Sequence, residues 1–289
     1  MKYISAIASV IFVLLLTAVS ALSQRNVSLA DNAALRYWSA FSAVQDSAIT
    51  DEQARELNAI LDGTAPYDDT KYKDLLEKNR LALEIIARGT SLANCDWGLD
   101  YGAEDVPVEY ARKALVLGRL NVLYAFHLFV AGNKDGGVRT LAAGLKFSHD
   151  VGNGGSLFAT LVAKDLLVNH LTAVVDVLHL DQLSAAQRAR LQEAVTRLGE
   201  GLDWRTAAKR DLEALRTQYA GDSQASAALA RIVSSYVAVL DEQSKLPILN
   251  EAIHSAPQQL ANLIPNAGRV LKQKQDLNNR LVQTLSLLQ

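Results

Sequence analysis

Apolar residues recur at helical spacing along almost the whole chain, and this periodicity constrains the fold more than any other feature. Stretches rich in Ala and Leu alternate with short breaks, and none shows the apolar–polar alternation of a strand. Thr50 with Gln53 and Ser184 with Gln187 form capping boxes, which satisfy free N–H groups at a helix start. The pattern predicts an all-α fold, an irregular stack of antiparallel helical hairpins.

Glycine and the five prolines fall mainly between the periodic segments, where they separate successive helices. Ser156 and Asp203 are suited to cap the segments that follow them. The expected helices span residues 31–45, 50–61, 69–89, 108–131, 136–150, 156–180, 184–198, 203–219, 223–240, 247–264 and 269–288. Such short connections favour antiparallel neighbours.

The N-terminal segment predicts export or membrane attachment. An apolar run spans residues 4–22, and no charged residue lies between Lys2 and Arg25. Val19-Ser20-Ala21 fits the small-x-small pattern that signal peptidase recognises. The run is also just long enough, at about 28 Å as a helix, to stay in a bilayer as an anchor.

We therefore expect a signal peptide or membrane anchor over residues 1–23, followed by a helical domain over residues 24–289. The domain is expected to be exported, either periplasmic or secreted. If residues 4–22 are not cleaved, they would attach it to a membrane, and this segment is its only expected membrane contact.

Composition and charge exclude some classes of protein. Apolar residues make up 49% of the chain and charged residues 21%, an ordinary globular balance. A net charge of −2 argues against a nucleic-acid partner, because neutralising phosphates requires a surplus of Lys and Arg. Cys95 is the single cysteine, so no disulfide forms within the chain; we expect a buried thiol, with pairing between chains as the alternative.

Motifs for a metal or a cofactor are lacking, and none is expected. No two histidines are spaced four apart, and no His-Glu-x-x-His or Gly-x-Ser-x-Gly sequence occurs. His127, between Phe126 and Leu128, is predicted to be a core histidine. A metal site assembled from distant helices stays open as an alternative.

One pair of predicted helices alternates large and small residues on either side of a turn at Gly132. The alternation is carried by Tyr124, Ala125, Leu128, Gly137, Leu141 and Gly144. This resembles one tetratricopeptide repeat of about 34 residues. Asn121 stands at the family's tryptophan and His149 at its proline, and one period later Leu166 replaces the turn glycine. The resemblance implies a tetratricopeptide-like hairpin within an irregular stack, not a regular solenoid.

The chain also resembles an uncharacterised group of predicted secreted bacterial all-helical proteins. The segments that carry the resemblance are Asn-Arg-Leu-Ala-Leu at residues 79–83, the Cys-Asp-Trp-Gly-Leu-Asp loop at residues 95–100 with Tyr101, and the helical hairpin after it. The resemblance implies export and a helical fold, and it implies no chemistry.

The loop over residues 95–102 is the first candidate site. Trp97 and Tyr101 offer aromatic faces to a sugar or peptide, and Asp96 and Asp100 offer carboxylates. The alternative is structural: Trp97 fills the core, and the two carboxylates bind local backbone amides. Cys95 is not predicted to be a nucleophile, because no histidine lies near it in the sequence.

A polar seam on the predicted 156–180 helix is the second candidate. Its members are spaced four, three, four and three apart on an otherwise apolar helix: Asp165, Asn169, Thr172, Asp176 and His179. Asp176 and His179 face each other as an acid–base pair would. The alternatives are a solvent-exposed face or an internal row of satisfied polar groups.

No catalytic residue is assigned, and an enzyme is the less favoured interpretation. We expect a non-catalytic exported helical protein whose groove binds a peptide or protein partner. One alternative is an exported enzyme with a cleft formed by the 95–101 loop and the 165–179 seam, which requires Trp97, Asp100, Asp176 and His179 in one pocket. The other is a membrane-anchored accessory subunit.

Overall fold

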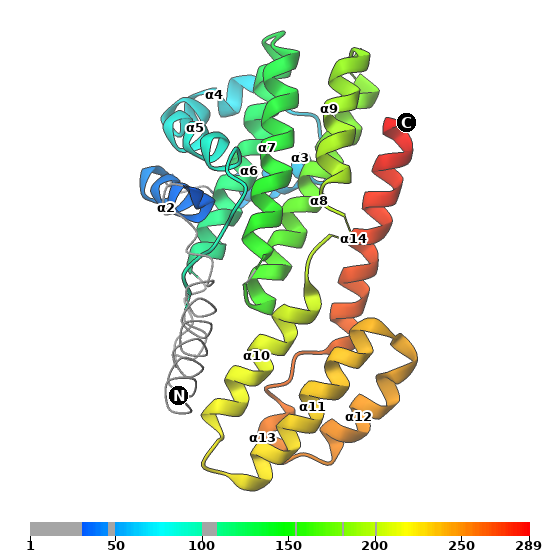
Figure 1. The fold of residues 1–289 in the computed structure, drawn as a ribbon. Helices are drawn as coiled ribbons and strands as arrows, with labels where there is room; N and C mark the ends of the chain where they lie inside the picture. Colours follow the sequence, from blue (N-terminus) through cyan, green and yellow to red (C-terminus); the bar gives the residue numbers. More distant parts are fainter. Residues whose placement is uncertain (1–30, 46–49, 100–108, 154, 181, 200) are drawn as a thin grey trace, which may run out of the picture.

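The computed structural model describes residues 31–45, 50–99, 109–153, 155–180, 182–199 and 201–289 (Figure 1). Every regular element in these ranges is a helix, and the only β-type pairing there is an isolated bridge between Asn32 and Asn94. The all-α prediction is therefore confirmed. The predicted signal peptide or anchor at residues 1–23 lies outside the described residues, as do the first residues of the predicted 24–289 domain.

Three long helices run up, down and up through the centre of the molecule. They are α6 (Glu109–Val130), α7 (Lys134–Gly152) and α8 (Leu157–Leu180). The α6–α7 turn uses Gly132 at a φ of 78°, where a side chain would be strained. A Cβ at Gly144 would lie 2.0 Å from His170 Nε2, so only glycine lets α7 and α8 approach this closely. The predicted hairpin is present, and its likeness to a tetratricopeptide repeat stays a prediction.

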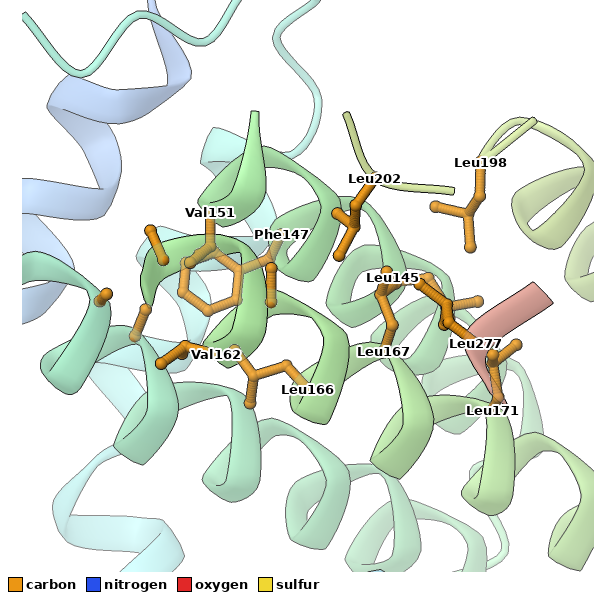
Figure 2. Packing of buried hydrophobic residues seen from close by; sticks show 14 of the residues in the cluster. Leu145, Phe147, Val151, Val162, Leu166, Leu167, Leu171, Leu198, Leu202 and Leu277 are labelled. Atoms are coloured by element: carbon orange, nitrogen blue, oxygen red, sulfur yellow. The ribbon is translucent and has the colours of Figure 1, made fainter. Parts of the chain in front are cut away.

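The main hydrophobic core lies between these helices and their neighbours. Figure 2 shows α7 and α8 in contact through aliphatic and aromatic side chains, covered by residues that follow α9 and by one residue of α14. The labelled residues are Leu145, Phe147, Val151, Val162, Leu166, Leu167, Leu171, Leu198, Leu202 and Leu277. Each buried side chain of this size contributes roughly 1.5–3 kcal/mol to stability.

α6 is the one described helix long and apolar enough to cross a membrane. Its buried residues include Leu117, Val122 and Leu123, which belong to the same core as α7 and α8. Burial against protein accounts for its apolar character, because a central helix is apolar on most of its faces.

A buried polar cluster joins the three central helices. His170 Nδ1 donates to the carbonyl of Leu166 at 2.8 Å and lies 3.3 Å from Ser148 Oγ, and His170 Nε2 lies 3.1 Å from the side-chain amide of Asn121. Burial lowers the pKa of His170 from 6.5 to about 4. The imidazole is therefore neutral at neutral pH.

Four shorter helices precede the central three: α2 (Ala33–Ala43), α3 (Asp51–Leu61), α4 (Asp69–Lys78) and α5 (Arg80–Gly89). α2 packs on α5, α4 packs on α6, and the end of α3 contacts α8. In Figure 1, α4 and α5 lie on one side of α7 and α9 lies on the other.

The prediction of one helix over residues 69–89 is wrong, because the chain changes direction at Asn79. This side chain is fully buried, accepts from Gln45 N at 2.8 Å and donates to the carbonyl of Leu75 at 3.0 Å. Asn79 thus ties α4 to the segment after α2, and a separate helix, α5, begins beside it.

The C-terminal half contains α9 (Ala185–Thr196), α10 (Trp204–Gln218), α11 (Ser223–Asp241), the 3₁₀-helix η2 (Gln243–Lys245), α12 (Leu246–His254), α13 (Gln258–Ala261) and α14 (Ala267–Leu288). α10 to α13 form one end of the molecule, and α14 returns along α8 and α9 (Figure 1). The predicted 247–264 helix is interrupted, because Pro257 lacks an N–H and stands at the start of α13.

The predicted helix caps are present. Both capping boxes form, with Thr50 accepting from Gln53 N and Ser184 from Gln187 N. Ser156 Oγ accepts from Ala159 N at 3.2 Å, and Asp203 accepts from Thr206 N at 2.9 Å. These local bonds depend on short sequence patterns, which is why the sequence predicts them well.

Candidate functional site: a groove across α7

An open groove of about 740 Å³ crosses the exposed face of α7 between α5 and α9. It is lined by Ala87, Thr90, Ser91, Leu92, Ala93, Tyr124, Leu128, Asn133, Gly136, Arg139, Thr140, Ala142, Ala143, Lys146, His149, Arg190, Glu193, Ala194, Arg197 and Leu198. α7 forms the floor, the end of α5 with part of α6 forms one wall, and α9 forms the other (Figure 1). A volume of this size is typical of ligand sites in proteins.

The helical period of α7 explains the floor. Val138, Leu141 and Leu145 are fully buried against the neighbouring helices. Arg139 and Ala143, which lie between them in sequence, turn to the opposite face and line the groove. Because the alanine side chains on this face of α7 are small, they cover little of the helix backbone, and the space above them forms the groove.

The two walls differ in character. On the α5–α6 side the groove is lined mainly by small and apolar side chains, including Leu92, Tyr124 and Leu128. On the α9 side it is lined by Arg190 and Arg197. A ligand in the groove therefore meets an apolar wall on one side and a cationic wall on the other.

The lining holds more positive than negative charge. Glu193 is the only acidic residue that lines it, and it pairs with Arg197 on its own helix. Arg139 and Arg190 are exposed and have no acidic partner among the described residues. Burial lowers the pKa of His149, so this imidazole adds no charge at neutral pH.

Lys146 differs from the two free arginines because its charge is neutralised. Lys146 Nζ lies 2.6 and 2.7 Å from the two carboxylate oxygens of Asp150, a buried residue. Asp150 also accepts from Tyr37 Oη at 2.6 Å. Burial, reinforced by the neighbouring Asp150 carboxylate, raises the pKa of the Tyr37 phenol, which therefore stays protonated as a donor.

The predicted loop site is held to the core by several hydrogen bonds. Trp97 is buried at 6% exposure and donates Nε1–H to the carbonyl of Asp150 at 2.8 Å. Asn32 donates to the carbonyl of Asp96 at 2.7 Å and accepts from Asp96 N at 2.9 Å. The Asp96 carboxylate is exposed and accepts from Gly98 N at 3.0 Å.

These contacts match the structural alternative to a binding loop: Trp97 fills the core, and the Asp96 carboxylate binds a local backbone amide. The indole of Trp97 packs among aromatic rings, with Tyr110 at 4.5 Å and Phe41 at 6.0 Å between centroids. Its aromatic face is therefore covered by protein. Asp100 and Tyr101, the other two predicted members of the site, lie outside the described residues.

Cys95 is half-buried beside the same part of α7, with its Sγ 4.0 Å from the carbonyl of Asp150. Burial, together with the nearby Asp150 carboxylate, raises the pKa of the thiol. A thiol in this environment is protonated at neutral pH and is a poor nucleophile.

The polar seam of α8 is not one continuous surface. Asp165 is exposed, with a side chain 62% accessible, whereas Asn169 and Thr172 are buried. Asp176 is half-buried, and burial raises its pKa against the opposing effect of His179 and Arg280. His179 is exposed at the end of the helix.

The middle of the seam faces the turn that follows α3. A Cβ placed on Gly63, just after α3, would lie 2.9 Å from Thr172 Cγ2 and 3.4 Å from the Asp176 carboxylate. Thr172 Oγ1 is buried with no hydrogen-bond partner among the described residues. Packing against α3 therefore covers the centre of the seam.

Trp97 and the Asp176–His179 part of the seam lie at opposite ends of the α7–α8 pair. Trp97 contacts the C-terminal end of α7 through Asp150. Asp176 and His179 lie at the C-terminal end of α8, beside the start of α7, where Lys134 Nζ donates to the carbonyl of Gln182 at 3.4 Å. None of the six predicted site residues that the structure describes lines the groove across α7.

His127 does not have the core environment predicted for it. Its side chain is 26% exposed, and Nδ1 lies 2.6 Å from Asp69 Oδ1, which also accepts from Tyr67 Oη at 2.9 Å. Burial acts to raise the pKa of Asp69, but the bonds from His127 and Tyr67 outweigh it, and the pKa is lowered. In the described part of the chain, no group of three or more His, Cys, Asp or Glu side chains is arranged to hold a metal ion.

The groove residues were missed because the sequence alone gives them little signal. Arg139 and Arg190 are ordinary exposed helix residues, 51 positions apart, and only the packing of α9 beside α7 brings them to one site.

Comparisons of the chain with protein families, with curated proteins and with solved structures find no match.

Proposed function

We propose that the protein is a non-catalytic exported protein that binds a peptide, or an extended segment of a partner protein, in the groove across α7. The observation that supports this most is the composition of the groove: a floor of small residues around Ala143, an apolar wall at Tyr124 and Leu128, and a cationic wall at Arg190. An extended peptide presents side chains to both sides, so it suits two unlike walls.

The site is also suited to binding because it requires no rearrangement. The floor and both walls belong to helices that pack on one another through buried residues such as Leu141 and Leu191. A groove that exists before the ligand arrives avoids the cost of ordering the protein. Export is proposed from the apolar segment at residues 4–22 alone.

The proposal is tested with the full chain and fluorescent random peptides of about eight residues, roughly 26 Å long when extended. Ala143→Trp places an indole on the groove floor, and we expect it to weaken peptide binding by at least about ten-fold, or about 1.4 kcal/mol. Ala230→Trp, at an exposed alanine of α11 far from the groove, is the matched control and should bind like the wild type.

Fluorescence anisotropy gives the affinities, and circular dichroism melting checks that both variants fold. A wild-type chain that binds no peptide pool would refute the proposal. Equal binding by Ala143→Trp and Ala230→Trp would also refute it, because the peptide would then lie elsewhere.

A further inference from the structure

α7 and α9 run side by side in the same direction (Figure 1), and a hydrogen bond at their N-terminal ends sets their register there. At their N-terminal ends, Gln187 Nε2 donates to Asp135 Oδ1 at 2.8 Å. At the other end, a Cβ on Gly152 would lie 2.7 Å from the side chain of Leu202, which follows α9. A residue of α7 therefore lies beside a residue of α9, or of the segment after it, that comes about 50 positions later in the chain. Residues at the same height along the two helices are called a level below.

This register places two pairs of cations at two levels of the groove. Arg139 is one turn beyond Asp135, and Arg190 is about one turn beyond Gln187, so the two arginines lie at the same level. Lys146 on α7 and Arg197, the C-cap residue of α9, follow seven residues later, about 10 Å along the axis.

The two levels differ in their counter-charges. At the second level each cation has a carboxylate on its own helix, Asp150 for Lys146 and Glu193 for Arg197. At the first level neither Arg139 nor Arg190 has an acidic partner among the described residues. Two like charges side by side repel each other, and an anion between them would remove that cost.

We infer that the occupant of the groove is an acidic peptide segment, one of whose carboxylates lies between Arg139 and Arg190. This inference rests on the proposed function and names the ligand class for the same site. A guanidinium donates two parallel hydrogen bonds to a carboxylate, so two arginines hold one carboxylate in a defined position.

The neighbouring apolar wall distinguishes a peptide from a simple anion. Leu128 and Tyr124 lie on the wall opposite Arg190, and they would contact an apolar side chain next to the acidic one. The cationic groove is a local feature, because the whole chain has a net charge of −2. A long polyanion would meet repulsion from the rest of the surface.

The test uses two matched pools of labelled peptides of about eight residues: an acidic pool with two fixed glutamates, and a neutral pool with glutamines in their place. The wild type should bind the acidic pool at least about ten-fold more tightly than the neutral pool. Raising the salt from about 50 to about 300 mM should reduce this preference, because exposed charges are screened.

The double variant Arg139→Gln/Arg190→Gln should lose at least about ten-fold in affinity for the acidic pool and keep its affinity for the neutral pool. The control is Arg231→Gln/Arg269→Gln, which changes the net charge equally at two exposed arginines of α11 and α14. The control should bind both pools like the wild type.

The failures of the two proposals are distinguishable. Equal binding of both pools, or equal losses in the two double variants, overturns the acidic-peptide inference and leaves peptide binding in place. Binding of neither pool overturns both. A labelled oligothymidylate that binds more tightly than the acidic pool, and is lost in Arg139→Gln/Arg190→Gln, identifies the ligand as a polyanion and overturns the peptide assignment.

Discussion

The indole N–H of Trp97 donates to the backbone carbonyl of Asp150 at 2.8 Å, and this bond joins the loop before α6 to the end of α7. The side chain of Asp150 bonds Tyr37 and Lys146. One residue therefore connects the aromatic core to the floor of the groove. Removing the Trp97 hydrogen bond should therefore lower the free energy of unfolding and should not remove a binding surface.

Trp97→Phe keeps an aromatic ring but removes the indole donor, which leaves the carbonyl of the buried Asp150 with the weak Cys95 thiol contact at 4.0 Å in its place. We expect a loss of about 1–3 kcal/mol in the free energy of unfolding, measured by urea denaturation. Trp38→Phe is the control, since Trp38 is half-buried in the same aromatic cluster and its indole N–H has no partner among the described residues. Equal losses in both variants would contradict the role given to the bond.

His170 should make the protein less stable in mild acid. Unfolded histidine binds a proton near pH 6.5, whereas His170 in the folded chain binds one only at about pH 4. The contribution of His170 to the free energy of unfolding is thus fully present above pH 6.5 and is lost as the pH falls to 4. At about 1.4 kcal/mol per pH unit, the loss amounts to about 3 kcal/mol.

Urea denaturation of His170→Gln between pH 7 and pH 4 should show a pH dependence weaker than that of the wild type by about this amount. His254→Gln, at an exposed histidine, is the control and should keep the wild-type dependence. A His170→Gln curve parallel to the wild-type curve would show that His170 is not the group responsible.

Gly144→Ala should destabilise the fold although alanine is the better helix former. Its Cβ would lie 2.0 Å from His170 Nε2 on α8 and 2.3 Å from Asn121 Oδ1 on α6, so these buried side chains, or the helices that carry them, would have to move away from α7. We expect a loss of at least about 2 kcal/mol, measured by thermal denaturation.

Gly268→Ala is the matched control, because Gly268 is exposed on α14 and its added Cβ would meet only Asn266 Oδ1, at 3.4 Å. This substitution should leave stability unchanged or raise it by up to about 1 kcal/mol. A Gly144→Ala chain as stable as Gly268→Ala would show that α7 and α8 tolerate a wider spacing.

Cys95 should react slowly with thiol reagents in the folded protein. Burial raises the pKa of its thiol, so little thiolate is present at pH 8. The rate of colour development with Ellman's reagent should be at least about 100-fold lower than in urea. Cys95 is the only cysteine, so the signal has a single source, and fast reaction of the native chain would place the thiol at the surface.

The sequence predicts the fold where local patterns decide it. The capping box at Thr50 and the cap at Asp203 both form, because each depends on residues within one turn. The split at Asn79 was not predictable, since it results from a hydrogen bond to Gln45, 34 residues earlier. Local periodicity continues through residue 79, and only the tertiary contact breaks the helix.

The candidate site was harder to predict for the same reason. The loop around Trp97 is conspicuous in sequence because it combines aromatic and acidic residues, yet its indole packs in the core. The groove arginines are inconspicuous, because Arg139 and Arg190 line one groove only through the way α9 lies beside α7. Composition identifies unusual residues, whereas a groove depends on which surfaces remain uncovered after packing.

The shared floor of the groove has a consequence for its selectivity. Since α5 and α9 both pack on α7, this one helix sets the distance between the two walls of the groove before a ligand arrives. The loss of freedom on association then falls almost entirely on the ligand. Peptides whose backbone is already extended, such as those stiffened by proline, should therefore dissociate from the groove more slowly than flexible peptides of similar length and charge.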